Sequence, residues 1–220
     1  MELIHFSSKK APVKQKPSFN EEKLLLKSGY HSIAGIDEVG RGAFAGPLVT
    51  AAVIFQDNYS FRDPDLYTIN DSKVLSPRQR ENLSEKIKKE ALCYSIAEIP
   101  VNYINHYGIG KAAQLGFYKA AQTLCHQPDF CLIDAFPISR LKKSIQKAII
   151  HGDSISYSIA AASIIAKVYR DSLMRKIHCD YREYDFATNK GYGTLKHRQQ
   201  IKKHGLSPVH RTSFSLNKFL

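Results

Sequence analysis

The chain has 220 residues, with 32 Lys and Arg against 20 Asp and Glu, a formal net charge of +12 and a pI near 9.5. This length predicts one domain, or one domain with an appendage, and the basic balance favours a polyanionic partner. The sequence has neither a run of 18 uncharged apolar residues nor an apolar N-terminal segment of signal-peptide length. These absences exclude a membrane-spanning protein, and we expect a cytoplasmic monomer.

The N-terminal part predicts a leader followed by a strand. Residues 1–30 are expected to form a partly disordered tail, with Pro12 and Pro17, and then a short helix near residues 20–27. A strand over residues 31–36 leads into Gly35-Ile36-Asp37-Glu38-Val39-Gly40-Arg41-Gly42. Adjacent carboxylates at a strand end are typical of a site for a hard divalent cation such as Mg2+. Because successive strand residues face opposite ways, both carboxylates can share one site only if the strand ends there.

The glycine run after these carboxylates does not fit two common phosphate-binding motifs. It lacks the Lys-Ser/Thr of a P-loop, and no helical pattern follows it as a dinucleotide-binding fingerprint requires. An Asp-Glu pair before a turn is also common at solvated strand ends, so a metal site needs further acidic residues.

The remaining elements alternate between strands and helices. Strands are expected over residues 48–55, 92–100, 130–133 and 147–150, and helices over 76–91, 109–125 and 158–179. Ser76 and Pro77 are the N-cap and first-turn residues that a helix favours. This order predicts an α/β protein with helices packed on a central sheet.

Two more carboxylates stand at strand ends. Asp134 follows the run Phe130 to Ile133, and Asp153 follows the strand expected over residues 147–150. Together with Asp37 and Glu38 they would repel one another unless cations intervened, and two divalent ions could serve in-line phosphoryl displacement. The alternative is that Asp134 and Asp153 each cap a turn or helix.

The C-terminal quarter of the chain carries most of the excess positive charge. Residues 166–220 hold 12 Lys and Arg against 4 Asp and Glu, which is +8 of the +12. This segment is the predicted clamp for a nucleic-acid backbone. Of its aromatic residues only Tyr192 is expected to stack on substrate, the others being core. Lys167 and Arg170 lie on one helix side, available to phosphates or to a local ion pair with Asp171.

The cysteines give no metal motif. Cys93, Cys125, Cys131 and Cys179 lack Cys-x-x-Cys spacing, which argues against a structural zinc site. We expect buried free thiols in a reducing compartment.

Seven motifs in order make the sequence resemble bacterial ribonuclease HII, a type 2 ribonuclease H. They are GIDEVGRG, then Asn70-Asp71-Ser72-Lys73 with Leu75-Ser76, Leu132-Ile133-Asp134, Gly152-Asp153-Ser154, Ala161 to Val168 with Arg170-Asp171, Lys190 to Thr194 with His197, and Pro208 with His210-Arg211-x-Ser213-Phe214. The resemblance implies a ribonuclease H-like fold with a mixed five-stranded sheet and a helical C-terminal extension. It divides the chain into a leader (1–30), a catalytic domain (31–180) and a basic substrate-binding extension (181–220).

The resemblance also implies an activity. The enzyme would cut RNA in RNA-DNA hybrids and incise 5′ of ribonucleotides embedded in duplex DNA, leaving 3′-hydroxyl and 5′-phosphate ends. Asp37, Glu38, Asp134 and Asp153 would be the catalytic carboxylates and hold two Mg2+ or Mn2+ ions, with Asp37 bridging them. Gly40, Arg41, Gly42 and Tyr192 would together read the junction between a ribonucleotide and the deoxynucleotide after it. Lys73, Lys167 and Arg170 are further candidates for substrate contact, although a local pair with Asp171 is the default for Lys167 and Arg170.

The sequence departs from the family pattern at a few positions. Ala135, followed by Phe136, and Asp185 stand where the family usually has Gly, and His151 stands where Lys is common. Arg41 and the short leader favour ribonuclease HII over ribonuclease HIII.

Rival functions remain open. The first is a non-catalytic RNA-binding module, which would not need carboxylates at three strand ends. The others are a ribonuclease HIII-like activity and a structure-specific DNA nuclease of the same fold. The C-terminal Leu216, Phe219 and Leu220 could dock into a sliding clamp, although packing of the terminal aromatic residues onto the body is the expectation.

Overall fold

The protein is built around a mixed five-stranded sheet. The computed structural model describes residues 16–216 and 219. Its strands are β1 (Ile33–Val39), β2 (Leu48–Ile54), β3 (Cys93–Ile99), β4 (Phe130–Asp134) and β5 (Gln146–Ile149), in the spatial order β3-β2-β1-β4-β5. The pairs β1-β2 and β2-β3 are antiparallel, while β1-β4 and β4-β5 are parallel. The sheet confirms the predicted fold class.

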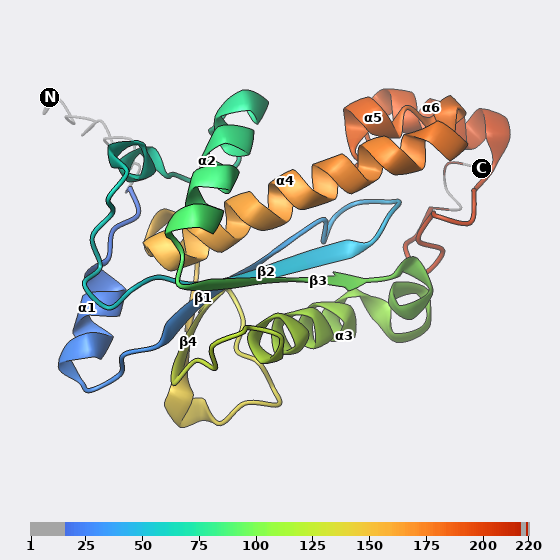
Figure 1. Ribbon diagram of the computed structural model, residues 1–220. Helices are drawn as coiled ribbons and strands as arrows, with labels where there is room; N and C mark the ends of the chain where they lie inside the picture. The colour runs from blue at the N-terminus through green and yellow to red at the C-terminus, as the bar shows by residue number, and fades with distance from the viewer. Residues whose placement is uncertain (1–15, 217–218, 220) are drawn as a thin grey trace, which may run out of the picture.

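Helices cover both faces of this sheet. They are α1 (Asn20–Lys27), α2 (Pro77–Glu90), α3 (Val101–Gln122), α4 (Tyr157–Asp180), α5 (Phe186–Asn189) and α6 (Leu195–His204). Figure 1 shows α4 across one face and α3 on the other, with α2 against α4, and with α5 and α6 grouped at the C-terminal end of α4. The helical C-terminal extension is therefore confirmed. Among the described residues, no helix is long and apolar enough to span a membrane.

The centre of the molecule lies between β1, β2 and α4. Every residue of β2 is buried, and so is each α4 residue from Ser158 to Ala166. Gly35 allows this contact, because a Cβ atom at that position would collide with the backbone of Ser158 and Ile159. The close approach places α4 directly beside the C-terminal end of β1.

Local sequence signals explain most helix boundaries. Ser76 and Gln79 form a reciprocal capping box at the start of α2, as the predicted N-cap requires. Helix α3 begins at Val101, well before the expected residue 109, and Gly108 interrupts it with a left-handed φ of 81°. That glycine hides the helical pattern of the first two turns, which is why the sequence prediction began after it.

The described part of the leader packs onto the body. Phe19 belongs to the main hydrophobic core, and Glu22 is fully buried. The Glu22 carboxylate accepts hydrogen bonds from Ser156 Oγ at 2.6 Å and from the Ser158 N–H at 3.1 Å. It therefore caps the N-terminus of α4, where the helix dipole favours a negative charge. The predicted disordered tail before Lys16 lies outside the described residues, and a boundary at residue 30 stays a prediction.

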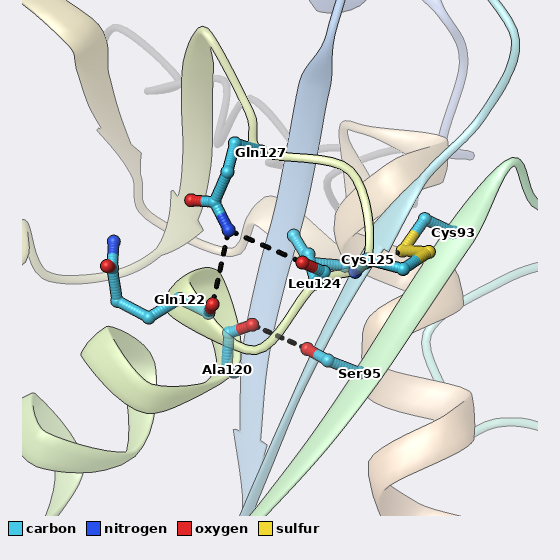
Figure 2. The surroundings of a disulfide bond; sticks show 7 residues. All are labelled: Cys93, Ser95, Ala120, Gln122, Leu124, Cys125 and Gln127. Carbon is cyan, nitrogen blue, oxygen red and sulfur yellow. Dashed lines mark hydrogen bonds between the residues drawn. A yellow bond between two sulfur atoms is a disulfide. The ribbon is translucent and has the colours of Figure 1, made fainter.

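The cysteine prediction was wrong for one pair. Cys93 at the start of β3 and Cys125 beyond the end of α3 form a disulfide, with Cα atoms 6.1 Å apart (Figure 2). No sequence pattern indicates this pairing, because the residues meet only when α3 folds back along β3. Nearby, Ser95 Oγ donates to the Ala120 carbonyl at 2.5 Å, which ties the same two elements together. Cys131 is a buried free thiol as expected, whereas Cys179 is free but exposed.

Candidate active site

The strand ends of β1 and β4 deliver three of the four predicted carboxylates to one cavity. Asp37, Glu38 and Asp134 line a cavity of about 560 Å³. The remaining lining residues come from the end of β1, the β1-β2 loop, the loop before α2, α2, α4 and the C-terminal region: Val39, Gly40, Arg41, Gly42, Ser72, Lys73, Arg80, Ser163, Lys167 and Tyr192. Because β1 and β4 are parallel neighbours, their C-terminal ends meet at one edge of the sheet, where ligands bind in α/β folds.

One expectation about β1 was wrong. The strand continues to Val39 and does not stop before Asp37. However, β4 pairs with β1 only as far as Ile36, so Asp37 and Glu38 lie beyond the paired part of β4. Both side chains can reach the cavity because the sheet is open on that side of β1.

Asp37 is the most buried of these acids. Burial raises the pKa of the Asp37 carboxyl well above its usual range, and the charges of Asp134, Glu38 and Asp153 raise it further. A hydrogen bond from Ser163 opposes this shift. Four carboxylates therefore interact electrostatically at one point, although they come from three separate segments of the chain.

Glu38 shares this environment. Burial raises the pKa of the Glu38 carboxyl to about 7, with Arg41 opposing the shift and Asp134 adding to it. Arg41 Nη1 lies 3.4 Å from Glu38 Oε1, which is a loose contact. The second oxygen, Oε2, is buried without a hydrogen-bond partner among the described residues. A buried carboxylate oxygen without a partner is costly, so a cation or donor supplied by a ligand would stabilise it.

Asp134 and Asp153 lie close together at the ends of β4 and η3 (Gly152–Ser154). Burial raises the pKa of Asp134, while the Gly152 N–H, which donates to its Oδ1 at 2.8 Å, opposes the shift. Asp153 is 5% exposed and does not line the cavity itself. Lys73 Nζ, which does line the cavity, lies 3.1 Å from Asp153 Oδ2 and acts as its counter-ion.

The predicted substrate-binding residues separate into two groups. Gly40, Arg41, Gly42, Lys73, Lys167 and Tyr192 all line the cavity. Lys167 forms the expected local pair with Asp171 at 2.8 Å. Arg170 is completely buried and donates to the carbonyls of Pro47, Lys190 and Ala45. Its guanidinium has no surface with which to contact a phosphate, so Arg170 supports the site from beneath and does not line it.

Four lining residues were not among the predicted site residues, namely Val39 and three polar residues. Ser163 on α4 shares a hydrogen bond of 3.0 Å with Ser72, and it also donates towards Asp37. Arg80 on α2 donates to the Ser72 carbonyl at 2.7 Å and fixes the loop that carries Lys73. Ser72 and Ser163 lie inside recognised motifs, so the sequence offered a signal for them, whereas Arg80 had none.

The three residues that depart from the family pattern share an unusual backbone conformation. Ala135, His151 and Asp185 all have a left-handed backbone, with φ values of 59°, 56° and 56°. Glycine reaches this region without strain, which accounts for its usual presence at positions 135 and 185. Asp tolerates the region better than Ala does, so the strain is greatest at Ala135. The same turn exposes Phe136, whose ring centroid lies 4.8 Å from Arg41 Cζ.

The C-terminal segment packs onto the body beside the cavity. Leu216 is buried, and the Phe219 ring stacks on Phe44 at a centroid distance of 5.6 Å. These contacts are those expected from packing of the terminal aromatic residues. Leu220, the third residue of the possible clamp-docking motif, lies outside the described residues.

The carboxylates fit divalent cations in chemistry but do not form a ready coordination shell. In the described part of the chain, no three His, Cys, Asp or Glu side chains are close enough to hold an ion as they are placed. The donors are nevertheless hard oxygen atoms, burial and then their mutual repulsion raise the pKa of three of the carboxyls, and Glu38 Oε2 has no partner among the described residues. A divalent ion would relieve all of these costs.

Comparison with known proteins decides the family. A family model described as Ribonuclease HII matches residues 34–217. The chain belongs to the ribonuclease HII family. Ribonuclease HII of Listeria monocytogenes is 46% identical over 203 residues, covering 92% of this chain and 75% of that protein. Ribonuclease HII of Clostridium beijerinckii is 47% identical over 191 residues, covering 87% and 70%. The protein is accordingly a nuclease of the ribonuclease H type, an endoribonuclease of RNA-DNA hybrids.

Solved structures agree with this assignment. The ribonuclease H2 of Pyrococcus horikoshii superposes with a TM-score of 0.69 at 25% identity, covering 86% of this chain and 96% of that one. A PCNA:RNase HII complex of Archaeoglobus fulgidus gives a TM-score of 0.65 at 25% identity, covering 82% and 92%. Bst-RNase HIII in complex with Mn2+, with a TM-score of 0.66 at 20% identity over 86% and 68% of the chains, shares the fold.

Proposed function

We propose that the cavity at the ends of β1 and β4 is the active site of a ribonuclease HII that also incises 5′ of single ribonucleotides embedded in duplex DNA. The products would carry 3′-hydroxyl and 5′-phosphate ends. One observation supports this proposal above the others: three strand-end carboxylates share a cavity with the Gly40-Arg41-Gly42 loop and Tyr192. The carboxylates would repel a phosphodiester, so we expect divalent cations to lie between them and the substrate.

Asp37, Glu38, Asp134 and Asp153 would hold two divalent ions, Mg2+ or Mn2+. When bound, such ions activate an attacking water and stabilise the departing oxygen of the phosphodiester. The Gly152 N–H orients the Asp134 carboxylate, and Ser163 orients that of Asp37. Lys73 neutralises Asp153 from the rim of the cavity. The Mn2+ in the Bst-RNase HIII structure supports divalent ions in this fold.

Recognition of the substrate would use the other side of the cavity. Tyr192 presents its ring there, and Lys167 Nζ lies 5.7 Å from its centroid. Stacking of Tyr192 on a sugar or base, with backbone N–H groups of Gly40-Arg41-Gly42 on the ribose, would read the step from a ribonucleotide to the following deoxynucleotide. Basic residues of the extension 181–220 would hold the duplex backbone.

A gel assay on duplex DNA with one internal ribonucleotide tests the proposal. We expect incision on the 5′ side of the ribonucleotide with Mg2+ or Mn2+, none in EDTA, and none on the all-DNA duplex. An RNA-DNA hybrid serves as the positive control for the family activity. Incision that persists in EDTA would contradict the metal-dependent mechanism, and cleavage of the hybrid without incision at the single ribonucleotide would restrict the proposal to hybrids. Cleavage of the all-DNA duplex would instead favour the structure-specific DNA nuclease.

A thermal-shift measurement tests the metal site independently of activity. We expect Mg2+ or Mn2+ to raise the melting temperature of the wild-type protein, because ion binding to the folded state stabilises it. Asp37→Asn should remove most of this shift. A wild-type melting temperature unchanged at millimolar ion would contradict ion binding, and a shift retained in Asp37→Asn would place the metal site elsewhere.

A further inference from the structure

A buried arginine holds the glycine loop of the cavity from beneath. Arg211 is 0% exposed, and no carboxylate pairs with it among the described residues. Its Nη1 donates to the Arg41 carbonyl at 3.0 Å, and its Nε donates to the Gly46 carbonyl at 3.0 Å. Burying an unpaired guanidinium is costly. These two carbonyl contacts offset part of that cost and fix both ends of the loop, while Arg211 Nη2 is buried without a hydrogen-bond partner among the described residues.

Arg170 holds the second half of the same loop. It donates to the carbonyls of Ala45 at 3.1 Å and Pro47 at 3.0 Å, and to that of Lys190 at 2.9 Å. Burial and the nearby charge of Arg170 lower the pKa of Arg211 to about 9, which leaves the Arg211 guanidinium charged at neutral pH. Arg170 makes no hydrogen bond to the peptide between Arg41 and Gly42. Of the two buried arginines, only Arg211 holds the orientation of this peptide.

The orientation of one peptide follows from this contact. The C=O and N–H of a trans peptide point in opposite directions, and the described chain has no cis peptide. Because Arg211 draws the Arg41 carbonyl inward, the Gly42 N–H must point outward, on the side of the cavity that Gly42 lines. Within the described residues, the Gly42 N–H donates to no backbone carbonyl or side chain.

We infer that Arg211 is a positioning residue, which holds the 41–42 peptide so that the Gly42 N–H donates to the ribose 2′-hydroxyl oxygen of the substrate. This inference rests on the proposed reading of a single ribonucleotide by the glycine loop. A loop without Arg211 could rotate this peptide and present the Arg41 carbonyl instead. Discrimination between ribose and deoxyribose would then fall, although the carboxylates would be intact.

Arg211→Lys tests the inference, with Arg170→Lys as its matched control. Lysine keeps the charge but cannot span two carbonyls as the guanidinium fork does. In the Asp134→Asn background with Mg2+, we would measure the Kd of a labelled duplex containing one ribonucleotide and of the all-DNA duplex. Arg211→Lys should reduce the preference for the ribonucleotide duplex by about tenfold, which is the contribution of one hydrogen bond. Arg170→Lys, which is equally buried, should lower the melting temperature but keep the preference within about twofold.

Each result bears on a separate statement. If the parent protein itself shows no preference for the ribonucleotide duplex, the proposed reading and the inference both fall. If the parent has a preference that Arg211→Lys retains, only the inference about Arg211 is overturned. An equal loss in both lysine variants also overturns it, because the effect would then come from general loosening of the loop.

A second measurement covers the case in which Arg211→Lys does not fold. The 15N-1H signal of Gly42 in the Asp134→Asn protein should shift on addition of the ribonucleotide duplex and shift clearly less with the all-DNA duplex. Equal shifts with both duplexes would show that this N–H does not meet the 2′-hydroxyl, and would overturn the inference without any substitution at Arg211.

Discussion

The Nε2 atoms of His197 and His210 lie 3.1 Å apart in the interior of the C-terminal region. His197 Nδ1 must carry a proton, because its partner is the Tyr192 carbonyl at 2.9 Å. His210 Nδ1 accepts from the Ser207 N–H at 2.9 Å, so the His210 proton is on Nε2 and is donated to His197. Both rings are therefore neutral, and together they fix the backbone of Tyr192.

This arrangement predicts a pH dependence of stability. Burial, with repulsion from the His197 ring when that ring is protonated, lowers the pKa of His210 from its ordinary 6.5 to about 4. The unfolded chain therefore binds more protons between these values, and the stabilisation from neutral His210 is complete above about pH 6.5 and is lost as the pH falls towards 4. Between pH 6.5 and pH 4 we expect the free energy of unfolding, measured with urea, to fall by about 3 kcal/mol more in the wild-type protein than in His210→Gln. Exposed His106→Gln is the control, and parallel losses in all three proteins would contradict the assignment.

Asp134→Asn should abolish cleavage while substrate binding is nearly retained. The amide oxygen can still accept from the Gly152 N–H, which bonds to Oδ1 at 2.8 Å, so the fold should be unchanged. The substitution removes the negative charge that binds a cation. Turnover should therefore fall below about a tenth of the wild-type value, which corresponds to an increase of more than about 1.4 kcal/mol in the activation free energy. Single-turnover cleavage and a gel-shift assay measure the two effects, with exposed Asp57→Asn as control. Residual turnover above a tenth would redirect attention to Asp71 or Asp171.

Tyr192→Ala should impair cutting at one embedded ribonucleotide more than cutting of a long hybrid. A long hybrid offers many registers, whereas a single ribose offers one. Loss of stacking should cost about 1–3 kcal/mol in kcat/KM on the single site. Tyr192→Phe keeps the ring and removes the hydroxyl, so it distinguishes the contribution of stacking from that of the hydroxyl group. Equal losses on both substrates would mean that the tyrosine packs the loop and does not read the substrate.

Ala135→Gly should stabilise the protein. Ala135 adopts a φ of 59°, which strains any residue with a Cβ atom. Glycine removes that strain but makes the unfolded chain more flexible, so we expect a net gain of about 0.5–1 kcal/mol in urea unfolding. Ala91→Gly is the control, because Ala91 has a φ of −63° and should only lose stability. A loss at both positions would show that the turn after β4 carries no strain.

The intact protein should not bind the cognate sliding clamp through its C-terminus. Leu216 is buried and Phe219 stacks on Phe44, so both would have to leave these contacts to dock. The PCNA:RNase HII complex of Archaeoglobus fulgidus makes the measurement worthwhile. A Kd below about 100 μM, which is a binding free energy more favourable than about −5.5 kcal/mol, would support clamp docking. It would also require the C-terminal segment to leave its contacts with the body.

Much of the fold was predictable because it depends on local patterns. The strand runs and the Ser76 cap act over a few residues, and the structure places them close to the predicted positions. The carboxylates were found in the same way, since each stands at the end of an apolar run. Helix α3 was missed in its first turns, where Gly108 breaks the local pattern.

The amino-acid sequence by itself determined the chemistry of this protein: which acids end the strands, where the basic charge lies and which motifs occur in order. Only the tertiary structure decided what the buried polar groups do. In the sequence Arg170 is a candidate for substrate contact and Arg211 is only part of a motif, yet folding brings both beneath a loop more than a hundred positions away, where carbonyls accept their hydrogen bonds. Cys93 and Cys125, and the two histidines behind Tyr192, meet for the same reason. Such partners are set by long-range packing, which no pattern over a few residues records.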